Sequence, residues 1–167
     1  GGKDRAKTDR ANWRFWLAKD VKKAVSIITQ HDGKIPNEPK HEAVVYPDSD
    51  TVIRLLSTTK GEVLYLDIET DFQHQMYCIG FNFSSSSSVF VVPVCRYNYT
   101  WAYGNLHKIL RALVLAMYNN EVVTHNGANF DLFILAWKYN LPFGNRLYDT
   151  MIAQHRIYPE IEKSLAH

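Results

Sequence analysis

Two carboxylates lie two positions apart within an apolar stretch of the sequence, Leu64-Tyr65-Leu66-Asp67-Ile68-Glu69-Thr70, which we expect to form a buried strand. Because side chains alternate between the two faces of a β-strand, Asp67 and Glu69 are expected to point to the same side. Neighbouring anions repel, and burying them unpaired costs on the order of several kcal/mol each. Divalent cations such as Mg²⁺ and Mn²⁺ bind carboxylate oxygens and remove that cost. The stretch therefore indicates either a metal site or a strand end, at which one acid pairs with a lysine or caps the following turn.

The composition is that of a globular protein. The chain has 167 residues, of which 46% are hydrophobic and 22% charged, so it is long enough for one domain with a sizeable core. The formal net charge of +2 neither indicates nor excludes a nucleic-acid partner, because a basic face can be hidden in a balanced total.

The cysteine, histidine and hydropathy patterns exclude several classes of protein. Cys78 and Cys95 form neither a disulfide framework nor a zinc-ligand spacing, and the seven histidines show no metal-ligand pattern at helical spacing. No apolar run is long enough to span a membrane, and the N-terminus lacks the apolar core of a signal sequence. We therefore expect a soluble intracellular protein without a membrane partner.

Residues 1–49 are predicted to form an N-terminal tail, an amphipathic helix and a linker. Gly1 to Arg10 are small and charged in both signs, which indicates a frayed tail. From Asn12 onward, apolar side chains recur at helical spacing, namely Trp13, Trp16, Leu17, Val21, Ala24 and Ile28. We favour a helix whose apolar stripe covers a core over one whose basic face contacts a nucleic-acid backbone. Three prolines between Gly33 and Asp50 indicate an extended linker or wrapping loop.

Three strands are predicted in the middle of the chain. Asp50 or Thr51 is a suitable cap for a short helix from Val52 to Ser57, which precedes the carboxylate strand. Alternating apolar residues then predict two further strands, Met76 to Phe83 and Val89 to Val94. The polar loop of five serines around their connection indicates an antiparallel hairpin. We expect this loop to be a surface turn, with a flexible segment that faces nucleic acid as the alternative.

The second half of the sequence alternates between helical and strand patterns. In chain order, these patterns predict a helix that Asn105 caps and that ends at Asn119, a strand from Val122 to His125, a helix that ends near Asn140, a strand from Arg146 to Tyr148, and a helix from about Asp149 to Pro159. The buried face of the middle helix is expected to consist of Phe130, Phe133, Ile134 and Trp137. The predicted fold class is therefore α/β, a mixed β-sheet flanked by helices.

A third carboxylate, Asp131, lies in the first turn of a helix that follows a strand. In such a sheet, strand-to-helix turns gather at one end and bring their side chains close to those of a neighbouring strand. We therefore expect Asp131 to approach Asp67 and Glu69, so that three carboxylates meet at one point.

These residues resemble a known family. The segments Asp67-Ile68-Glu69-Thr70 and His125-Asn126-Gly127-Ala128-Asn129-Phe130-Asp131 are similar to the first two motifs of the DEDD superfamily of 3′-5′ exonucleases, which have a ribonuclease H-like fold. Tyr148-Asp149-Thr150-Met151 and Lys163-Ser164-Leu165 further resemble the proofreading exonuclease domain of phage-like family A DNA polymerases. The resemblance covers residues 50–167, which we interpret as an exonuclease-like domain that follows an N-terminal helical extension.

The resemblance implies a two-metal mechanism at the three carboxylates. Two Mg²⁺ or Mn²⁺ ions about 4 Å apart would activate a water and stabilise the leaving oxygen during phosphodiester hydrolysis. Asp67 would bridge both ions, Glu69 would hold the ion that activates water, and Asp131 would help to hold the other. The implied substrate is the 3′ end of a single-stranded DNA.

Four further residues are candidates for substrate binding, namely Thr70, Phe72, Asn126 and Phe130. Phe72 is expected either to stack on a terminal base or to cover the core. Asn126 is expected to help set the strand terminus, and Phe130 to pack the site as a core residue. His125 is expected to form a structural hydrogen bond rather than to act as a general base. Asp149 is expected to cap a helix rather than to bind a metal.

The third motif of the family pairs a tyrosine or histidine with the fourth metal-binding aspartate, and it is expected beyond Leu165. Neither His155 nor His167 is followed by an aspartate at the required spacing within the sequence. We therefore expect the chain to be a fragment of a longer protein, truncated within the exonuclease domain. Loss of one ligand predicts weak metal binding and poor catalysis for this fragment.

Three functions remain open from the sequence. The leading hypothesis is a metal-dependent 3′-5′ exonuclease that proofreads DNA for a polymerase domain in the same longer chain. The same fold acting on RNA is a close alternative, because contacts to a 2′-hydroxyl cannot be recognised in the sequence. A catalytically inactive nucleic-acid-binding or scaffold module is the third, although the intact Asp67, Glu69 and Asp131 argue against it.

Overall fold

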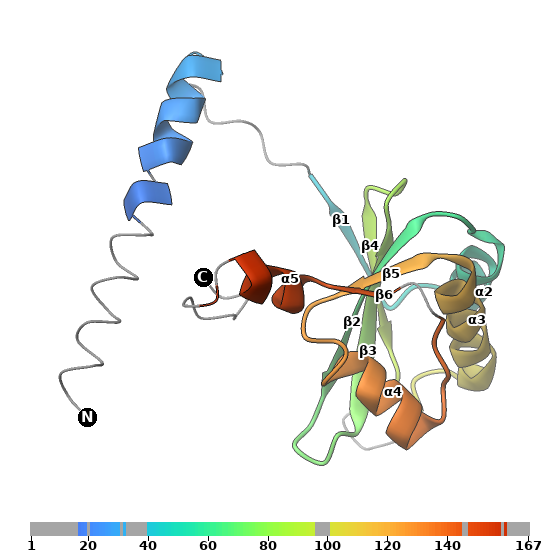
Figure 1. Cartoon of the computed structure of the whole chain (residues 1–167). Coiled ribbons are helices and arrows are strands. Elements are labelled where there is room, and N and C mark those ends of the chain that lie inside the picture. The colour runs from blue at the N-terminus through green and yellow to red at the C-terminus, as the bar shows by residue number, and fades with distance from the viewer. Residues whose placement is uncertain are drawn as a thin grey trace, which may run out of the picture. The chain divides into compact units, whose positions relative to one another are not determined.

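The computed structural model describes residues 17–19, 21–30, 32, 40–95, 101–144, 147–157 and 159. The chain divides into two compact units, residues 40–153 and residues 1–39 together with 154–167 (Figure 1). The larger unit contains the sheet and the helices that cover it.

The larger unit is built on a six-stranded sheet with the strand order β1-β4-β3-β2-β5-β6. The strands are β1 (Glu42–Val45), β2 (Val63–Thr70), β3 (Met76–Phe83), β4 (Ser88–Pro93), β5 (Glu121–Thr124) and β6 (Leu147–Asp149). β2, β3 and β4 pair in antiparallel order, whereas β1 pairs with β4, and β5 with both β2 and β6, in parallel. The predicted α/β class, the mixed sheet and the hairpin of β3 and β4 are confirmed.

Helices cover one face of this sheet. The helices α2 (Ser49–Thr58), α3 (Leu106–Asn119) and α4 (Asp131–Tyr139) lie on the same side (Figure 1), and their apolar residues join those of the strands in one core cluster. The helix α5 (Thr150–Ile157) follows β6. The predicted alternation of helices and strands in the second half is confirmed.

The central strand β2 has one buried face and one exposed face. Leu64, Leu66 and Ile68 are at most 4% exposed, whereas Asp67 and Glu69 project from the opposite face and are exposed. The expectation that the two carboxylates are buried is therefore wrong, because this face of β2 is open to solvent. An apolar run that contains two acids is compatible with a strand that is buried on both faces and with a strand that is buried on one face only. The sequence therefore could not distinguish them.

β1 lies in a segment that the sequence pattern assigned to a linker. Glu42–Val45 pairs in parallel with Ser88–Val91 of β4, so the sheet begins before Asp50. The prolines at positions 36, 39 and 47 fall outside these residues and leave the N–H groups of the strand available for pairing. The expected linker is thus wrong for β1, and residues 33–39 lie outside the part of the chain that the structure describes.

The caps of two helices differ from those predicted. Asp48, and not Asp50 or Thr51, caps α2, because its Oδ2 accepts a hydrogen bond from Thr51 N at 2.9 Å. Asn105 precedes α3 as predicted, but its side chain does not cap the helix. It donates instead to Ser49 Oγ at 3.0 Å, which ties α3 to α2.

The buried face of α4 also differs from the prediction. Its buried residues are Asp131, Leu132, Ile134 and Leu135. Phe133 and Trp137, which were expected in the core, are 52% and 62% exposed. The helix is apolar at nearly every position, so periodicity alone could not select the face that packs on the sheet.

In the smaller unit, residues 17–19 and 21–30 are helical, as predicted. Leu17, Val21 and Ile28 are exposed, so the core that this stripe was expected to cover is not found among the described residues. No helix in the described ranges is long and apolar enough to cross a membrane. Other predicted positions lie outside the described residues, namely Gly1–Arg10, Trp13, Trp16, Arg146 and Lys163–His167.

A buried asparagine joins the end of α3 to the start of β2. Asn120 is 1% exposed, and its Oδ1 accepts a hydrogen bond from Glu62 N at 3.0 Å. Its Nδ2 donates to Thr59 O and Ala116 O at 3.0 and 2.9 Å. Glu121 N in turn donates to Glu62 O at 2.9 Å. These bonds set the register at which β5 joins β2.

Replacing Asn120 with alanine should lower the free energy of unfolding by about 2–4 kcal/mol, because Glu62 N–H and the Thr59 carbonyl then lose a buried partner. Urea denaturation followed by circular dichroism measures the change. Asn119→Ala is the matched control, since it keeps the backbone carbonyl that accepts from Gly61 N. An equal loss in both variants would contradict this role of Asn120.

Candidate active site

β2 extends beyond its neighbour β5 at the end where the carboxylates lie. The two strands pair only over Val63–Tyr65 of β2, and β5 ends at Thr124. Even-numbered residues of β2 direct their backbone groups toward β5, as the preceding hydrogen bond from Glu121 N to Glu62 O indicates. Ile68 N–H therefore points to a position beyond the end of β5.

Asp131 fills this position. The residue is 1% exposed, and its Oδ1 accepts a hydrogen bond from Ile68 N at 2.8 Å. Ile68 lies between Asp67 and Glu69, so the bond fastens the first turn of α4 to the middle of the carboxylate strand. Asp131 thus lies against β2, as expected from its place in a strand-to-helix turn.

The turn between β5 and α4 depends on Asn126, which adopts an unusual backbone conformation, and on Gly127, which lies too close to Thr124 for a side chain. Asn126 adopts a left-handed conformation with a φ of 62°, which asparagine tolerates better than most residues. A Cβ on Gly127 would overlap the Thr124 side chain, so only glycine fits at this position. Leu132 N donates to Gly127 O at 2.8 Å, which joins the turn to the helix.

Asp149, at the end of β6, holds the same turn from the other side. Its Oδ1 accepts from Asn126 N at 2.9 Å, and its Oδ2 from Ala128 N at 3.3 Å. Oδ1 also accepts from Met151 N and Ile152 N at 2.9 and 3.3 Å. Burial opposes the charge of Asp149, but these N–H groups outweigh burial and hold its pKa below the usual value. Asp149 therefore caps α5, as predicted, and also binds the turn, which the sequence did not reveal.

His125 forms a structural hydrogen bond, as expected. Its Nδ1 lies 2.9 Å from Thr150 Oγ1, and that hydroxyl donates to Thr124 O at 3.1 Å. Because the hydroxyl proton is engaged by the carbonyl, Nδ1 acts as the donor toward Thr150. The ring thus connects the end of β5 to the start of α5.

The candidate carboxylates influence one another electrostatically through Asp67. The Asp67 side chain is exposed, but neighbouring atoms partly shield its carboxyl from water, and this desolvation, followed by the Glu69 anion, raises the pKa of Asp67. Burial also raises the pKa of Asp131 to about 6, against the opposing effect of Ile68 N–H. The anions of Asp67 and Asp149 raise the pKa of Asp131 further. A cation placed among these groups would relieve their repulsion.

The donor chemistry suits a divalent cation, although the side chains do not form a complete site. Asp67 and Glu69 share the exposed face of β2, and carboxylate oxygens are the ligands that Mg²⁺ and Mn²⁺ prefer. Within the part of the chain that the structure describes, no three Asp, Glu, His or Cys side chains converge on one metal position. The metal-binding roles of Asp67, Glu69 and Asp131 therefore stay predictions.

The loop after β2, residues 71–75, is held by the side chain of Asp71. Its Oδ1 accepts from Gln73 N and Gln75 N, both at 2.8 Å, and its Oδ2 is buried without a hydrogen-bond partner. Lys138 Nζ on α4 donates to Gln73 O at 2.7 Å and so fastens the loop to the helix. Asp71 was not among the predicted site residues, although an aspartate that opens a turn after a strand is a recognised Asx-turn signal.

The structure separates the roles of the candidate substrate-binding residues. Phe72 stands on the 71–75 loop and is 87% exposed, so the alternative that it covers the core is wrong. Thr70 is half-buried, and its Oγ1 donates to Asp71 O at 3.1 Å. Phe130 packs against the core, and the Asn126 side chain bonds within its own turn. Their contacts with a substrate stay predictions.

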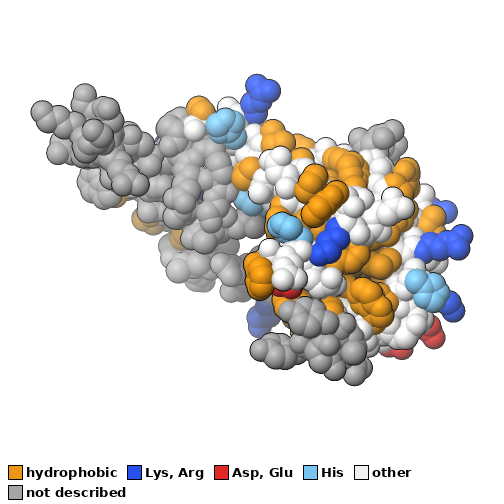
Figure 2. Space-filling model, turned by 90° about the horizontal axis from the view of Figure 1, so that it is seen from below, with side chains coloured by type: hydrophobic (Ala, Val, Ile, Leu, Met, Phe, Trp, Pro, Cys, Tyr) orange, Lys and Arg blue, Asp and Glu red, His pale blue; other side chains and the backbone are white. Residues whose placement is uncertain are grey.

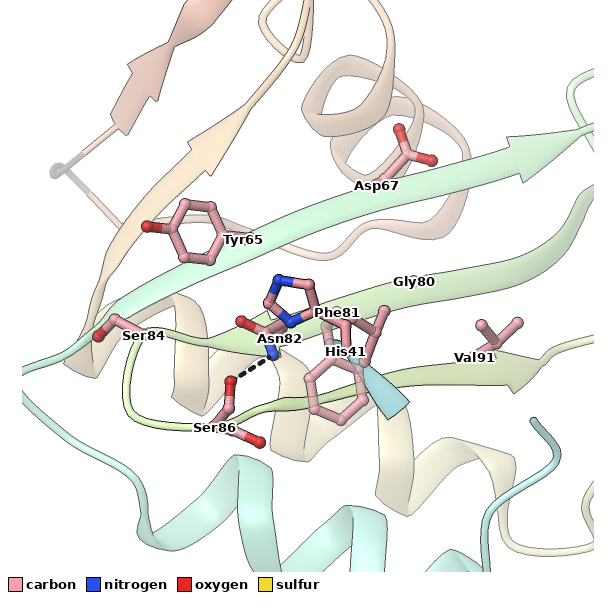
Figure 3. Close-up of a pocket in the computed structure, with 10 residues that line it drawn as sticks. His41, Tyr65, Asp67, Gly80, Phe81, Asn82, Ser84, Ser86 and Val91 are labelled. Carbon is pink, nitrogen blue, oxygen red and sulfur yellow. Dashed lines mark hydrogen bonds between the residues drawn. The ribbon is translucent and has the colours of Figure 1, made fainter. Parts of the chain in front are cut away.

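A shallow hollow of about 670 Å³ lies on the open face of the sheet beside Asp67 (Figure 3). It includes Gly80, the partner of Asp67 on β3, and Asn82 on the same strand. The Asn82 amide is fixed, because its Nδ2 donates to Ser86 O and Ser88 O at 3.1 and 2.6 Å. The missing side chain at Gly80 leaves the space next to the Asp67 carboxylate open to a ligand.

No protein-family model matches the chain, and no curated protein sequence matches it either. Solved structures do match. Trypanosoma brucei RNase D in complex with RNA U12 is 12% identical, with a TM-score of 0.52, and the match covers 68% of this chain and 39% of that chain. The EXO domain of Aedes aegypti Nibbler is 9% identical, with a TM-score of 0.50, and the match covers 74% of this chain and 59% of that chain.

Similarity at such low identity establishes the fold alone. It does not establish the activity, because one fold supports many activities. The chain spans only 39% and 59% of the lengths of these two proteins. The predicted ribonuclease H-like fold, a mixed sheet flanked by helices, is confirmed.

The buried charge of Asp131 should make stability depend on pH. Its folded pKa of about 6 lies above the roughly 3.9 of an unfolded aspartate. The folded state therefore takes up a proton as the pH falls through 6 and gains stability until about pH 4. We expect wild type to gain about 1–3 kcal/mol relative to Asp131→Asn as the pH falls across this window. Urea denaturation with a chelator present measures the difference.

The asparagine variant is a close match, because its side-chain oxygen still accepts from Ile68 N. Asp50→Asn, which replaces an exposed acid on α2, is the control for the general effect of removing one charge. A difference between wild type and Asp131→Asn that does not change with pH would contradict a raised pKa at Asp131.

Proposed function

We propose that the protein is a metal-dependent 3′-5′ exonuclease that acts on the end of single-stranded DNA. The observation that carries the proposal is the hydrogen bond from Ile68 N to Asp131, which holds a buried carboxylate beside the two exposed carboxylates of β2. The fold shared with an RNase D and with the Nibbler EXO domain supports it.

In this proposal, Asp67, Glu69 and Asp131 hold two divalent cations, Mg²⁺ or Mn²⁺. Bound cations would supply an activated water and neutralise charge on the phosphate that is cleaved. Asp131 has to lose its proton before it can act as a ligand, and its pKa of about 6 favours loading near neutral pH over loading in acid. Ile68 N–H keeps the carboxylate oriented while the proton leaves.

The terminal nucleotide would lie between the carboxylates and the 71–75 loop. Phe72 presents an exposed ring on which a terminal base can stack. The bonds that Asp71 forms with Gln73 N and Gln75 N order the backbone of the loop that carries this ring. Gly80 leaves room beside Asp67 for the sugar and phosphate.

DNA is the first candidate substrate, because Tyr148-Asp149-Thr150-Met151 resembles the proofreading domains of family A DNA polymerases. In that case the chain would work with a polymerase domain in the same longer protein. RNA is the second candidate, which the structural similarity to an RNase D bound to RNA favours.

Digestion of 5′-labelled single-stranded DNA with Mn²⁺ tests the proposal. With protein in excess over DNA, we expect a slow ladder that shortens from the 3′ end and disappears with a chelator. Asp67→Ala should lower the rate by at least about a hundredfold, because it removes a proposed metal ligand. Asp50→Ala, which removes an exposed acid on α2, should leave the rate unchanged.

RNA of the same sequence, digested in parallel, distinguishes the two candidate substrates. Faster shortening of the RNA would favour the second candidate. Folded protein that binds DNA but shortens neither strand would contradict the exonuclease and favour the nucleic-acid-binding module.

Phe72→Ala should raise the KM for single-stranded DNA about five- to tenfold, because one base loses its stacking partner. The Tm should stay unchanged, since the ring is 87% exposed and contributes little to the core. Phe72→Tyr keeps an aromatic ring and should restore the KM. An unchanged KM in Phe72→Ala would mean that the ring does not contact the substrate.

A further inference from the structure

Two aromatic side chains form a stacked pair on the exposed side of α4. Phe133 and Trp137 are 52% and 62% exposed, and their ring centroids lie 5.6 Å apart with an angle of 17° between the ring planes. They are four residues apart, which makes them neighbours on one face of the helix. Neither side chain belongs to the core cluster, so packing of the helix does not account for the pair.

The pair continues into the loop that follows the carboxylate strand. His74 contacts Trp137 edge-on, with ring centroids 6.1 Å apart and an angle of 76°. Lys138, the next residue on α4, bonds to Gln73 O of the loop. Phe72, on the same loop, is 87% exposed. An aromatic surface thus extends from α4 to the end of β2, and we call His74, Phe133 and Trp137 the α4 aromatic patch.

The charged side chains of α4 and of the 71–75 loop favour an anionic ligand. Lys138 supplies an ammonium group. The one acid of α4, Asp131, and the one acid of the 71–75 loop, Asp71, do not present their carboxylates to solvent. Asp131 is 1% exposed, and Asp71 has one oxygen bound by N–H groups and the other buried. Figure 2, seen from this end of the molecule, shows hydrophobic side chains gathered with Lys or Arg and His side chains among them. Exposed rings beside cations are typical of surfaces that bind unpaired bases and phosphates.

We propose that the α4 aromatic patch binds the single-stranded DNA that leads to the 3′ end, with bases stacked on Phe133 and Trp137. The proposal rests on the proposed exonuclease function and adds a second binding element to it. A helix rise of about 1.5 Å per residue places the two rings about 3 and 9 Å along α4 from Asp131, on the opposite side of a helix that is about 10 Å across. A stacked strand advances about 3.4 Å per nucleotide, so a base about three to four nucleotides from the end is the first that can reach the pair.

Binding without hydrolysis tests this proposal. The double variant Phe133→Leu/Trp137→Leu removes both rings and keeps side chains that favour a helix. Its affinity for a fluorescently labelled decanucleotide of thymidine is measured by anisotropy in EDTA. We expect binding to weaken roughly tenfold or more, whereas binding of a dinucleotide, which is too short to reach the pair, should change less than about twofold.

Tyr118→Leu is the matched control. Tyr118 is 57% exposed near the end of α3, where Asn119 O accepts a hydrogen bond from Gly61 N just before β2. This ring therefore lies at the opposite end of β2 from the 71–75 loop, and its loss should leave both affinities unchanged. The Tm of each variant verifies that the fold is intact.

Unchanged affinity of the double variant for the decanucleotide would overturn the proposal. Tighter patch-dependent binding of the matching RNA would overturn the choice of DNA. Trimming of the decanucleotide by wild type with Mn²⁺ is measured separately. Its absence would defeat the proposed exonuclease, while the affinity difference in EDTA still decides whether the patch binds the strand.

Discussion

The hydrogen bond from Ile68 N to the Asp131 carboxylate is the contact on which the candidate site depends. β5 ends before it reaches Ile68, so this bond takes the place of strand pairing. Without it, β2 would leave an unpaired N–H between its two acids, and the start of α4 would lose its attachment to the sheet. The same bond partly offsets the burial that raises the pKa of Asp131 to about 6. The candidate site thus depends on Asp131, a carboxyl group whose charged form is disfavoured by its burial.

Asp131 and Asp149 show that environment, and not residue type, decides what a carboxylate does here. Backbone N–H groups from two segments surround Asp149 and hold its pKa below the usual value, so it acts as a charged structural anchor. Asp131 accepts from Ile68 N and lies near other anions, and its pKa is raised to about 6, which suits the role of a metal ligand that we propose for it. Asp149 helps to position Asp131, because it binds the turn of Asn126 and Gly127 that leads into α4.

Periodicity predicted most strands and helices, because alternation and helical spacing are local properties of the sequence. It could not predict which face of α4 is buried, since Phe133 and Trp137 are as apolar as the leucines that enter the core. β1 was missed because four residues between prolines carry little pattern. The position of Asp131 in a strand-to-helix turn predicted that it lies next to β2, but the bonds of Asp71 and Asp149 run to N–H groups that only the folded turns bring together.

The features that folding does not require gather at one end of the sheet. The repulsion between Asp67 and its neighbouring acids opposes the folded state, and the exposed rings of Phe72 and Trp137 add nothing to the core. A ligand that binds only the folded protein can relieve this repulsion and bury the rings. Both changes lower the free energy of the complex and so strengthen binding. Carboxylates bind cations, and exposed aromatic rings stack on flat apolar groups. The ligand that we propose, a strand of nucleotides with metal ions, would bind both kinds of group, whereas a metal alone or an apolar partner alone would bind only one.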